Sequence, residues 1–197
     1  MNWKALFLAS LLAYGAYHSW QTRTVTHGAG EVAAETPQQQ ELDDVQPQNI
    51  NGYQVTPLAK FDIQARLLSS ESYSMGREAD LSPIDFALGW GPMSDEAVLD
   101  KIDIRQSGRF YFWHVDAFPI PRNEIETHSA NMHMIPVDAS VERALKTVRV
   151  GQVVHITGYL VEAKAADGWR WRSSLTRNDT GNGACELVLV KSLYVRQ

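Results

Sequence analysis

A strict alternation of apolar and polar residues between positions 59 and 67 constrains the fold more than any other feature of the chain. A period of two places the apolar side chains on one face of a β-strand and the polar ones on the other. The apolar members of this run are Ala59, Phe61, Ile63, Ala65 and Leu67. In the segment from 153 to 163, one face likewise carries Val154, Ile156, Gly158 and Leu160. Both segments therefore predict strands with a buried face.

The order of the remaining elements predicts a small barrel. Strands are expected at 84–90, 109–115, 169–176 and 186–195, with a polar, glycine-rich loop at 178–183. Asp138 is placed to cap a helix whose apolar stripe is Val141, Ala144, Leu145 and Val148. Three strands, a helix and two strands resemble the OB fold, a five-stranded Greek-key barrel. We predict a mainly β fold, an OB-like β-barrel with one or two short helices; another small closed or half-open barrel is the alternative.

The N-terminal segment, residues 1–21, predicts a transmembrane helix. No charge lies between Lys4 and Arg23, although this stretch is at the short end of the roughly 17–25 residues that a spanning helix needs. Trp3 and Trp20 bracket it, as aromatic residues do at membrane interfaces. We expect an uncleaved signal-anchor, with a cleaved signal peptide or a buried soluble helix as alternatives. The predicted location is the bacterial inner membrane, single-pass, with the C-terminal domain in the periplasm.

Residues 22–51 predict a flexible acidic linker, and residues 52–197 the barrel domain. The linker holds prolines, glycines and a glutamine run, and residues 31–50 carry five acids and no base. Low hydrophobicity of this kind does not bury enough surface to offset the entropy lost on ordering. We expect the linker to hold the barrel away from the membrane.

Charge and cysteine content exclude some classes of protein. The formal net charge is -5, and no segment is strongly basic, which argues against a nucleic-acid partner. The one cysteine, Cys185, excludes a disulfide-stapled scaffold and zinc sites built from several cysteines. We expect no metal ion and no cofactor.

Two polar strand faces are the candidate binding surface. Ser129, Asn131 and His133 share one face of the extended segment before Pro136. The second face, on the tryptophan-rich strand, is formed by Arg170, Arg172, Ser174 and Thr176. Arginines and hydroxyls in a row suit a carboxylate or phosphate. The alternative is a solvated face whose arginines pair with acids such as Glu162.

An enzymatic interpretation rests on His114, His128, His133 and Cys185. A thiolate beside a histidine is a nucleophile pair, and zinc accepts both ligands. The spacing does not support either site, because His128 and His133 are five positions apart and point to opposite faces of a straight strand. We therefore list no catalytic residue, and the chain is not expected to be an enzyme.

Three motifs resemble a family of uncharacterised membrane-anchored bacterial proteins. They are Gly89–Asp95 (GWGPMSD), His128–Pro136 (HSANMHMIP) and Ser173–Glu186 (SSLTRNDTGNGACE). The resemblance implies an envelope location and no particular activity, cofactor or catalytic residue.

The predicted function is that of a membrane-anchored periplasmic binding or assembly module that recognises a protein or an envelope polymer. The inner membrane, reached through the N-terminal helix, and that partner are the expected contacts. A periplasmic hydrolase or metal-dependent enzyme, and an OB module that binds single-stranded nucleic acid, are the alternatives.

Overall fold

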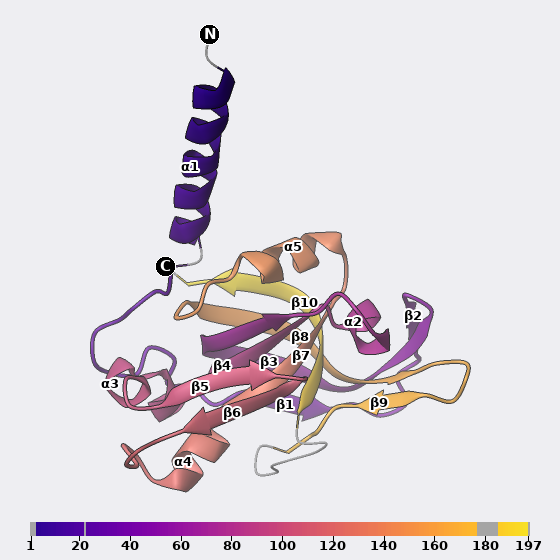
Figure 1. The fold of residues 1–197 in the computed structure, drawn as a ribbon. Coiled ribbons are helices and arrows are strands. Elements are labelled where there is room, and N and C mark those ends of the chain that lie inside the picture. Colours follow the sequence, from indigo (N-terminus) through magenta and orange to yellow (C-terminus); the bar gives the residue numbers. More distant parts are fainter. Residues whose placement is uncertain (1–2, 22, 177–184, 197) are drawn as a thin grey trace.

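The computed structural model describes residues 3–21, 23–176 and 185–196, and its fold is mainly β (Figure 1). Five strands close a ring: β3 (Tyr53–Ser72), β4 (Ile84–Gly89), β7 (Ser129–Pro136), β10 (Glu186–Val195) and β8 (Val153–Lys164). Neighbours in this order are antiparallel except β7 and β10, which are parallel, and β8 returns to β3. The predicted mainly β barrel is confirmed.

The interior of the ring is the principal hydrophobic core. The apolar residues of the alternating run in β3 all face it, together with Phe86 of β4, Met132 of β7 and Val188 of β10. Helix α5 (Ala139–Thr147) lies between β7 and β8 in the chain, as predicted, and packs Val141 and Leu145 on this core. Its first turn is capped by Asp138, whose carboxylate accepts hydrogen bonds from the backbone N–H groups of Ser140 and Val141.

Two further apolar layers cover the outside of the ring. One is made by α2 (Arg77–Leu81) and the β8–β9 hairpin, with β9 at Arg170–Arg172, over β8 and β10. The other is the insertion between β4 and β7, which packs on Ala87 of β4. This insertion contains η1 (Gly91–Ser94), α3 (Glu96–Leu99), β5 (Asp103–Ser107), β6 (Phe110–His114) and α4 (Arg122–Thr127).

Several local predictions need correction. The strand predicted over 169–176 is limited to β9, and the predicted loop at 178–183 lies outside the described residues. Strand β5 and helix α4 were not predicted. The reason is that β5 is polar and stabilised by its partner β6, while α4 has a proline at its N-cap and no long apolar period.

The segment predicted as a flexible linker is bound along the barrel. Val25 donates a backbone hydrogen bond of 2.8 Å to Val150, and Ala33 is fully buried and hydrogen-bonded to Ser94. Strands β1 (Gln38–Glu41) and β2 (Gln48–Ile50) both pair with β3. The linker prediction is therefore wrong for residues 23–51. Composition argues only against an independent core, whereas here the backbone obtains its partners from the barrel.

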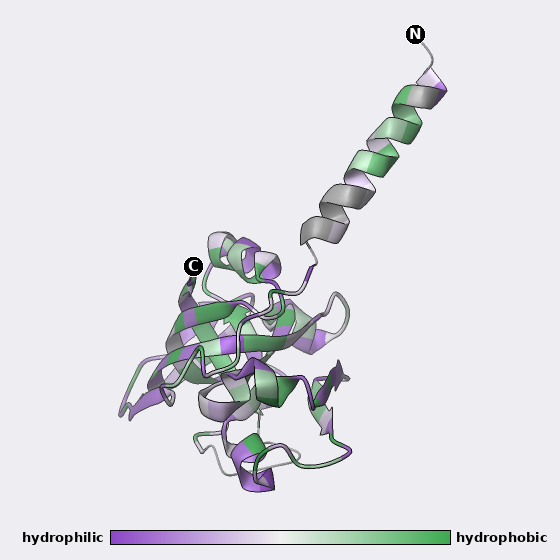
Figure 2. Cartoon of the chain, turned by 90° about the vertical axis from the view of Figure 1, so that its left-hand side faces the viewer, coloured by the Kyte–Doolittle hydropathy of each residue, from purple (hydrophilic) through white to green (hydrophobic). Residues whose placement is uncertain are grey.

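The N-terminal segment forms helix α1 (Trp3–Gln21), which projects from the barrel in Figure 1. Figure 2 shows hydrophobic residues along it, and Leu6, Phe7, Leu11 and Leu12 are exposed. Over the described ranges, no helix combines the length and the hydrophobicity needed to cross a membrane, so the predicted transmembrane helix is not found.

Gly158 of β8 lies where the backbone of β10 approaches it closely. It faces β10, and a Cβ added to it would lie 2.0 Å from the carbonyl oxygen of Leu189. We expect Gly158→Ala to lower the free energy of unfolding by about 2 kcal/mol or more, because two paired strands must separate to admit the methyl group. Urea denaturation measures the loss.

Gly28→Ala is the matched control, since a Cβ at Gly28 meets nothing within 4 Å. Its effect is expected to stay within about 0.5 kcal/mol. Equal stability of the two variants would contradict the close approach of β8 and β10.

Candidate functional site

Ser129, Asn131 and His133 share the outer face of β7, as predicted, but all three are buried. The β5–β6 hairpin covers Ser129 and Asn131. Tyr111 of β6 donates a hydrogen bond of 3.1 Å to the hydroxyl of Ser129, and Gln106 of β5 donates one of 2.6 Å to Oδ1 of Asn131. Burial raises the pKa of Tyr111 to about 12, so its phenol is protonated at neutral pH. This polar face holds the insertion onto the ring.

Asp85 of β4 lies directly opposite His133 in the strand register and has 0% exposed surface. Its Oδ2 is 3.0 Å from Nδ1 of His133, close enough for an ion pair, although the two atoms are not oriented as in a regular hydrogen bond. Its Oδ1 accepts a hydrogen bond of 2.7 Å from Nη1 of Arg109. A carboxylate without contact to water thus has a cation beside it.

Arg109 reaches Asp85 from the tip of the β5–β6 hairpin. Gly108 and Arg109 form the two-residue turn, with φ of 58° and 73°. The left-handed region costs a residue with a side chain roughly 1–2 kcal/mol. Contacts offset that cost: the guanidinium lies 3.7 Å from the centre of the Tyr73 ring, and the backbone N–H of Arg109 donates to the Tyr73 hydroxyl at 3.1 Å.

Trp171 of β9 completes this group from the other outer layer. Its ring centroid lies 4.7 Å from that of His133 and 5.7 Å from the guanidinium carbon of Arg109. We call Asp85, Arg109, Asn131, His133 and Trp171 the seam cluster, because it lies where the two outer layers meet on β4 and β7. Its charges and hydrogen bonds join both layers to the ring.

Arg170 and Arg172 are not brought into the seam cluster. They lie on the opposite face of β9 from Trp171, and both pair with Glu162 of β8. This pairing is the one expected under the alternative to a binding face. Burial raises the pKa of Glu162, but hydrogen bonds from Lys164 and Arg170 and their charges outweigh it and lower that pKa below its ordinary value. Both arginines of the predicted face therefore form an ion pair within the protein, and they share the single carboxylate of Glu162 with Lys164.

Ser174 and Thr176 hydrogen-bond to each other, and the backbone N–H of Ser174 donates to the carbonyl of Cys185. The hydroxyl of Ser174 donates to the carbonyl of Thr176 at 3.2 Å and accepts from its N–H at 3.1 Å, which makes a local turn after β9.

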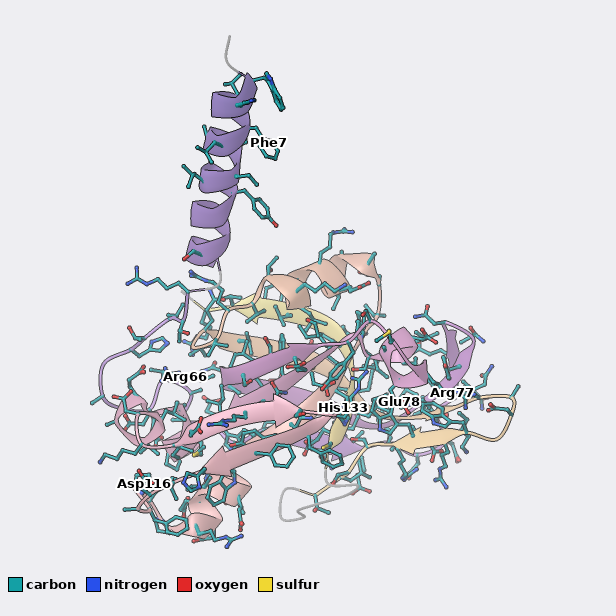
Figure 3. The ribbon with its side chains drawn as sticks, viewed as in Figure 1. Phe7, Arg66, Arg77, Glu78, Asp116 and His133 are labelled. Carbon is teal, nitrogen blue, oxygen red and sulfur yellow. The ribbon has the colours of Figure 1, made fainter. Side chains whose placement is uncertain are left out.

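The three histidines of the enzymatic interpretation do not converge. His114 is exposed near Asp116, and Figure 3 shows Asp116 well apart from His133. His128 lies 3.0 Å from Glu124 and packs beside Trp90. Cys185 comes just before β10, and its Sγ lies 4.0 Å from Nδ2 of Asn131. His133 pairs with Leu187, which is two residues further along the chain.

No group of three or more His, Cys, Asp or Glu residues in the described part of the chain is arranged to hold a metal ion.

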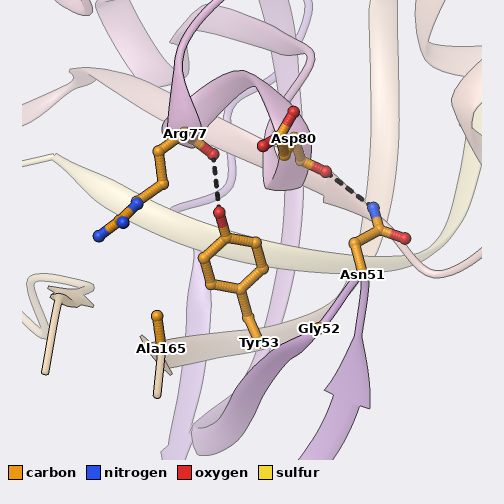
Figure 4. Close-up of a pocket in the computed structure, with 6 residues that line it drawn as sticks. All are labelled: Asn51, Gly52, Tyr53, Arg77, Asp80 and Ala165. Atoms are coloured by element: carbon orange, nitrogen blue, oxygen red, sulfur yellow. Dashed lines mark hydrogen bonds between the residues drawn. The ribbon is translucent and has the colours of Figure 1, made fainter. Parts of the chain in front are cut away.

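An open pocket of about 400 Å³ lies at one end of the barrel (Figure 4). It is lined by residues of the β2–β3 turn, the start of β3, helix α2 and the β8–β9 connection: Asn51, Gly52, Tyr53, Arg77, Asp80 and Ala165. Nδ2 of Asn51 donates to the carbonyl of Asp80 at 2.7 Å, which joins the turn to α2. We call this the loop-end pocket.

Aromatic rings connect the loop-end pocket to the seam cluster. Tyr53 and Trp169 are 5.5 Å apart, Trp169 and Trp171 are 6.0 Å apart, and Trp171 meets His133. Arg77 lies 5.5 Å from the Trp169 ring and binds Asp167 in the β8–β9 turn through Nη1 and Nη2.

The sequence interpretation missed Asp85, Arg109 and the loop-end pocket. Asp85 could have been recognised from the sequence, because it is the only charged residue in the apolar run from Ile84 to Trp90. The Asn51–Gly52 pair is a hairpin-turn signal, but nothing local indicates that Arg77 and Ala165 meet it.

Asp85→Asn tests the role of the buried carboxylate. The substitution keeps the shape but removes the charge that faces Arg109 and His133, so we expect a loss of about 3 kcal/mol in the free energy of unfolding. The control is Asp103→Asn, which breaks the exposed pair with Arg105 and should cost less than about 1 kcal/mol. If denaturation curves show equal losses, the seam cluster does not hold the outer layers.

Comparison of the chain with known protein families, curated proteins and solved structures finds no match. The resemblance to membrane-anchored bacterial proteins therefore stays a prediction.

Proposed function

We propose that this protein is a non-catalytic binding module of the bacterial envelope, which holds an envelope polymer at the loop-end pocket. One observation carries the proposal: an accessible pocket with aromatic and polar walls forms where three connections meet. The side chains with reactive chemistry lie elsewhere. His133 is buried against Asp85 and Trp171, and His114 and His128 are separate from it.

The strand order supports an OB-like assignment for the barrel. The ring has five strands, one parallel pair and a helix between its third and fourth strands. OB barrels bind oligonucleotides and oligosaccharides with the loops after their first and fourth strands, in addition to one sheet face. The equivalent connections here supply Arg77, Asp80 and Ala165 to the loop-end pocket. A similar fold does not by itself indicate a similar function, so the proposal rests on the residues of the pocket.

Charge pairing argues against the single-stranded nucleic-acid alternative. Arginines beside aromatic rings suit single strands when their charge is available to phosphates. Here Arg77 is bound to Asp167, Arg109 to Asp85, and Arg170 to Glu162. The formal net charge of -5 also disfavours a polyanion.

We further propose that α1 associates with the inner membrane and that the barrel lies in the periplasm. The support is an uncharged stretch from 5 to 22 and the exposed apolar side chains of α1. Such a helix gains free energy by leaving water.

Cell fractionation tests the proposed location. The full chain is expected in the membrane pellet, and a chain without residues 1–21 in the soluble fraction, because the transfer of apolar surface is lost. Recovery of both chains in the soluble fraction would overturn the proposal that α1 associates with the membrane. It would not affect the proposal that the pocket binds a polymer.

Co-sedimentation with isolated bacterial sacculi, the insoluble wall polymer, tests the binding function. We expect the full chain to sediment with them and the double variant Asn51→Gly, Arg77→Ala to be reduced about fivefold or more, because the pocket loses two polar groups. Arg105→Ala is the matched control, since Arg105 is likewise an exposed arginine paired with one aspartate. Wild-type protein that stays in the supernatant, or soluble fragments released from the sacculi, would count against a non-catalytic polymer-binding module.

A further inference from the structure

The loop-end pocket offers hydrogen-bonding groups that the protein does not use itself. The carboxylate of Asp80 has no hydrogen-bond or ion-pair partner among the described residues, since only its backbone carbonyl binds Asn51. Oδ1 of Asn51 likewise has none within that part of the chain. The guanidinium of Arg77 contributes donors, because two contacts with Asp167 leave some of its N–H groups available. The pocket lining therefore offers one donor group, on Arg77, and two acceptor groups, on Asn51 and Asp80.

The same pocket has an apolar wall. The ring of Tyr53 lines it, and Trp169 packs edge-on against that ring. Gly52 has φ of 87° and a position where an added Cβ would meet nothing within 4 Å, so the turn leaves space beside the ring. A ring wall beside mixed polar groups is the composition of small-molecule sites in which a few polar groups set orientation.

The electrostatic field at the pocket excludes anionic ligands. Arg77 is the one cation in the pocket lining, and Asp167 neutralises it, while Glu78 and Asp80 add negative charge on α2. The pKa of the Tyr53 phenol is raised, first by burial and then by Asp80, with Glu78 and Asp167 adding to the rise and Arg77 opposing it. Phosphate or carboxylate groups of a polymer would face net repulsion here.

A cationic ligand is disfavoured for a different reason. The position beside the Trp169 ring, where a cation would be attracted, is held by the chain's own guanidinium of Arg77 at 5.5 Å. What remains is an uncharged ligand rich in hydroxyl or amide groups.

We propose that the loop-end pocket binds an uncharged saccharide unit of a glycan chain, with Tyr53 as the apolar wall and Asn51, Arg77 and Asp80 as the hydrogen-bonding groups. This rests on the proposed polymer-binding function. The open mouth of the pocket suits a chain that continues in both directions, and its volume of about 400 Å³ is at the lower end for ligand sites. The glycan then continues past Trp169 toward Trp171, both of which are partly exposed.

Isothermal titration of the full chain in detergent tests the ligand class. Three probes are compared: a hexamer of N-acetylglucosamine, a single-stranded thymidine oligonucleotide and spermidine. We expect the saccharide to bind with an affinity that changes less than about twofold between roughly 50 and 500 mM salt, because no ion pair forms. The other two probes should not bind.

Single-site variants locate the saccharide. Asn51→Gly removes the amide and keeps the turn, since glycine accepts the φ of 50° at this position. Arg77→Ala removes the guanidinium from an exposed helix. Each is expected to weaken the saccharide about fivefold or more, whereas Arg105→Ala leaves it unchanged. Circular dichroism verifies folding, and Asn51→Gly keeps the test decisive if Arg77→Ala unfolds.

The outcomes distinguish a failure of the saccharide proposal from a failure of the polymer-binding proposal on which it rests. Binding of the oligonucleotide or spermidine in place of the saccharide, no saccharide binding, or variants equal to wild type overturns the saccharide assignment. If sacculi still retain wild-type protein and release the double variant, polymer binding stands and the ligand is a non-glycan part of the wall. If sacculi retain neither, the binding function itself fails.

Discussion

The carboxylate of Asp85, enclosed on an otherwise apolar strand, is the constraint on which the outer architecture depends. A buried ionised carboxylate is costly without a paired charge, and removal of one partner leaves the other uncompensated. Arg109 supplies that charge from a hairpin tip in the left-handed region, and His133 lies on the next strand. The β5–β6 hairpin must therefore cover β4 and β7, and the Ser129 and Asn131 hydrogen bonds fix its underside.

The polar residues of the seam cluster serve to assemble the fold. His133 and Asn131, the strongest candidates for a ligand site by residue type, are occupied in joining the outer layers to the ring. Arg170 and Arg172 are matched by Glu162 on the neighbouring strand. The accessible chemistry lies instead at the end of the barrel, where Tyr53, Arg77 and Asp80 line an open pocket. Trp169 and Trp171 connect the two regions, so the same packing that closes the seam also supports the end of the barrel where the pocket lies.

Much of the barrel could be predicted because its signals are local. The alternation in β3, the capped helix after Asp138 and the Val153–Ala163 strand each carry a period that a short window reveals. The linker prediction failed for residues 23–51 for one reason. Low hydrophobicity prevents a segment from forming its own core, but it does not prevent the segment from hydrogen-bonding to a barrel that is already folded. Val25 fits against the barrel where Gly151 has no side chain, since a Cβ there would lie 1.8 Å from the Val25 carbonyl oxygen. Only the folded barrel presents that space.

By itself, the sequence determined which residues face the ring interior, where α5 begins, and that residues 5–22 carry no charge, because periodicity, capping and composition act over a few neighbouring positions. The tertiary structure alone decided which polar groups meet. Asp85, Arg109 and His133 are separated by more than twenty positions each, and the loop-end pocket joins residues 51, 77 and 165. Strand register and loop packing bring such groups together, and neither leaves a pattern in any one segment of the chain.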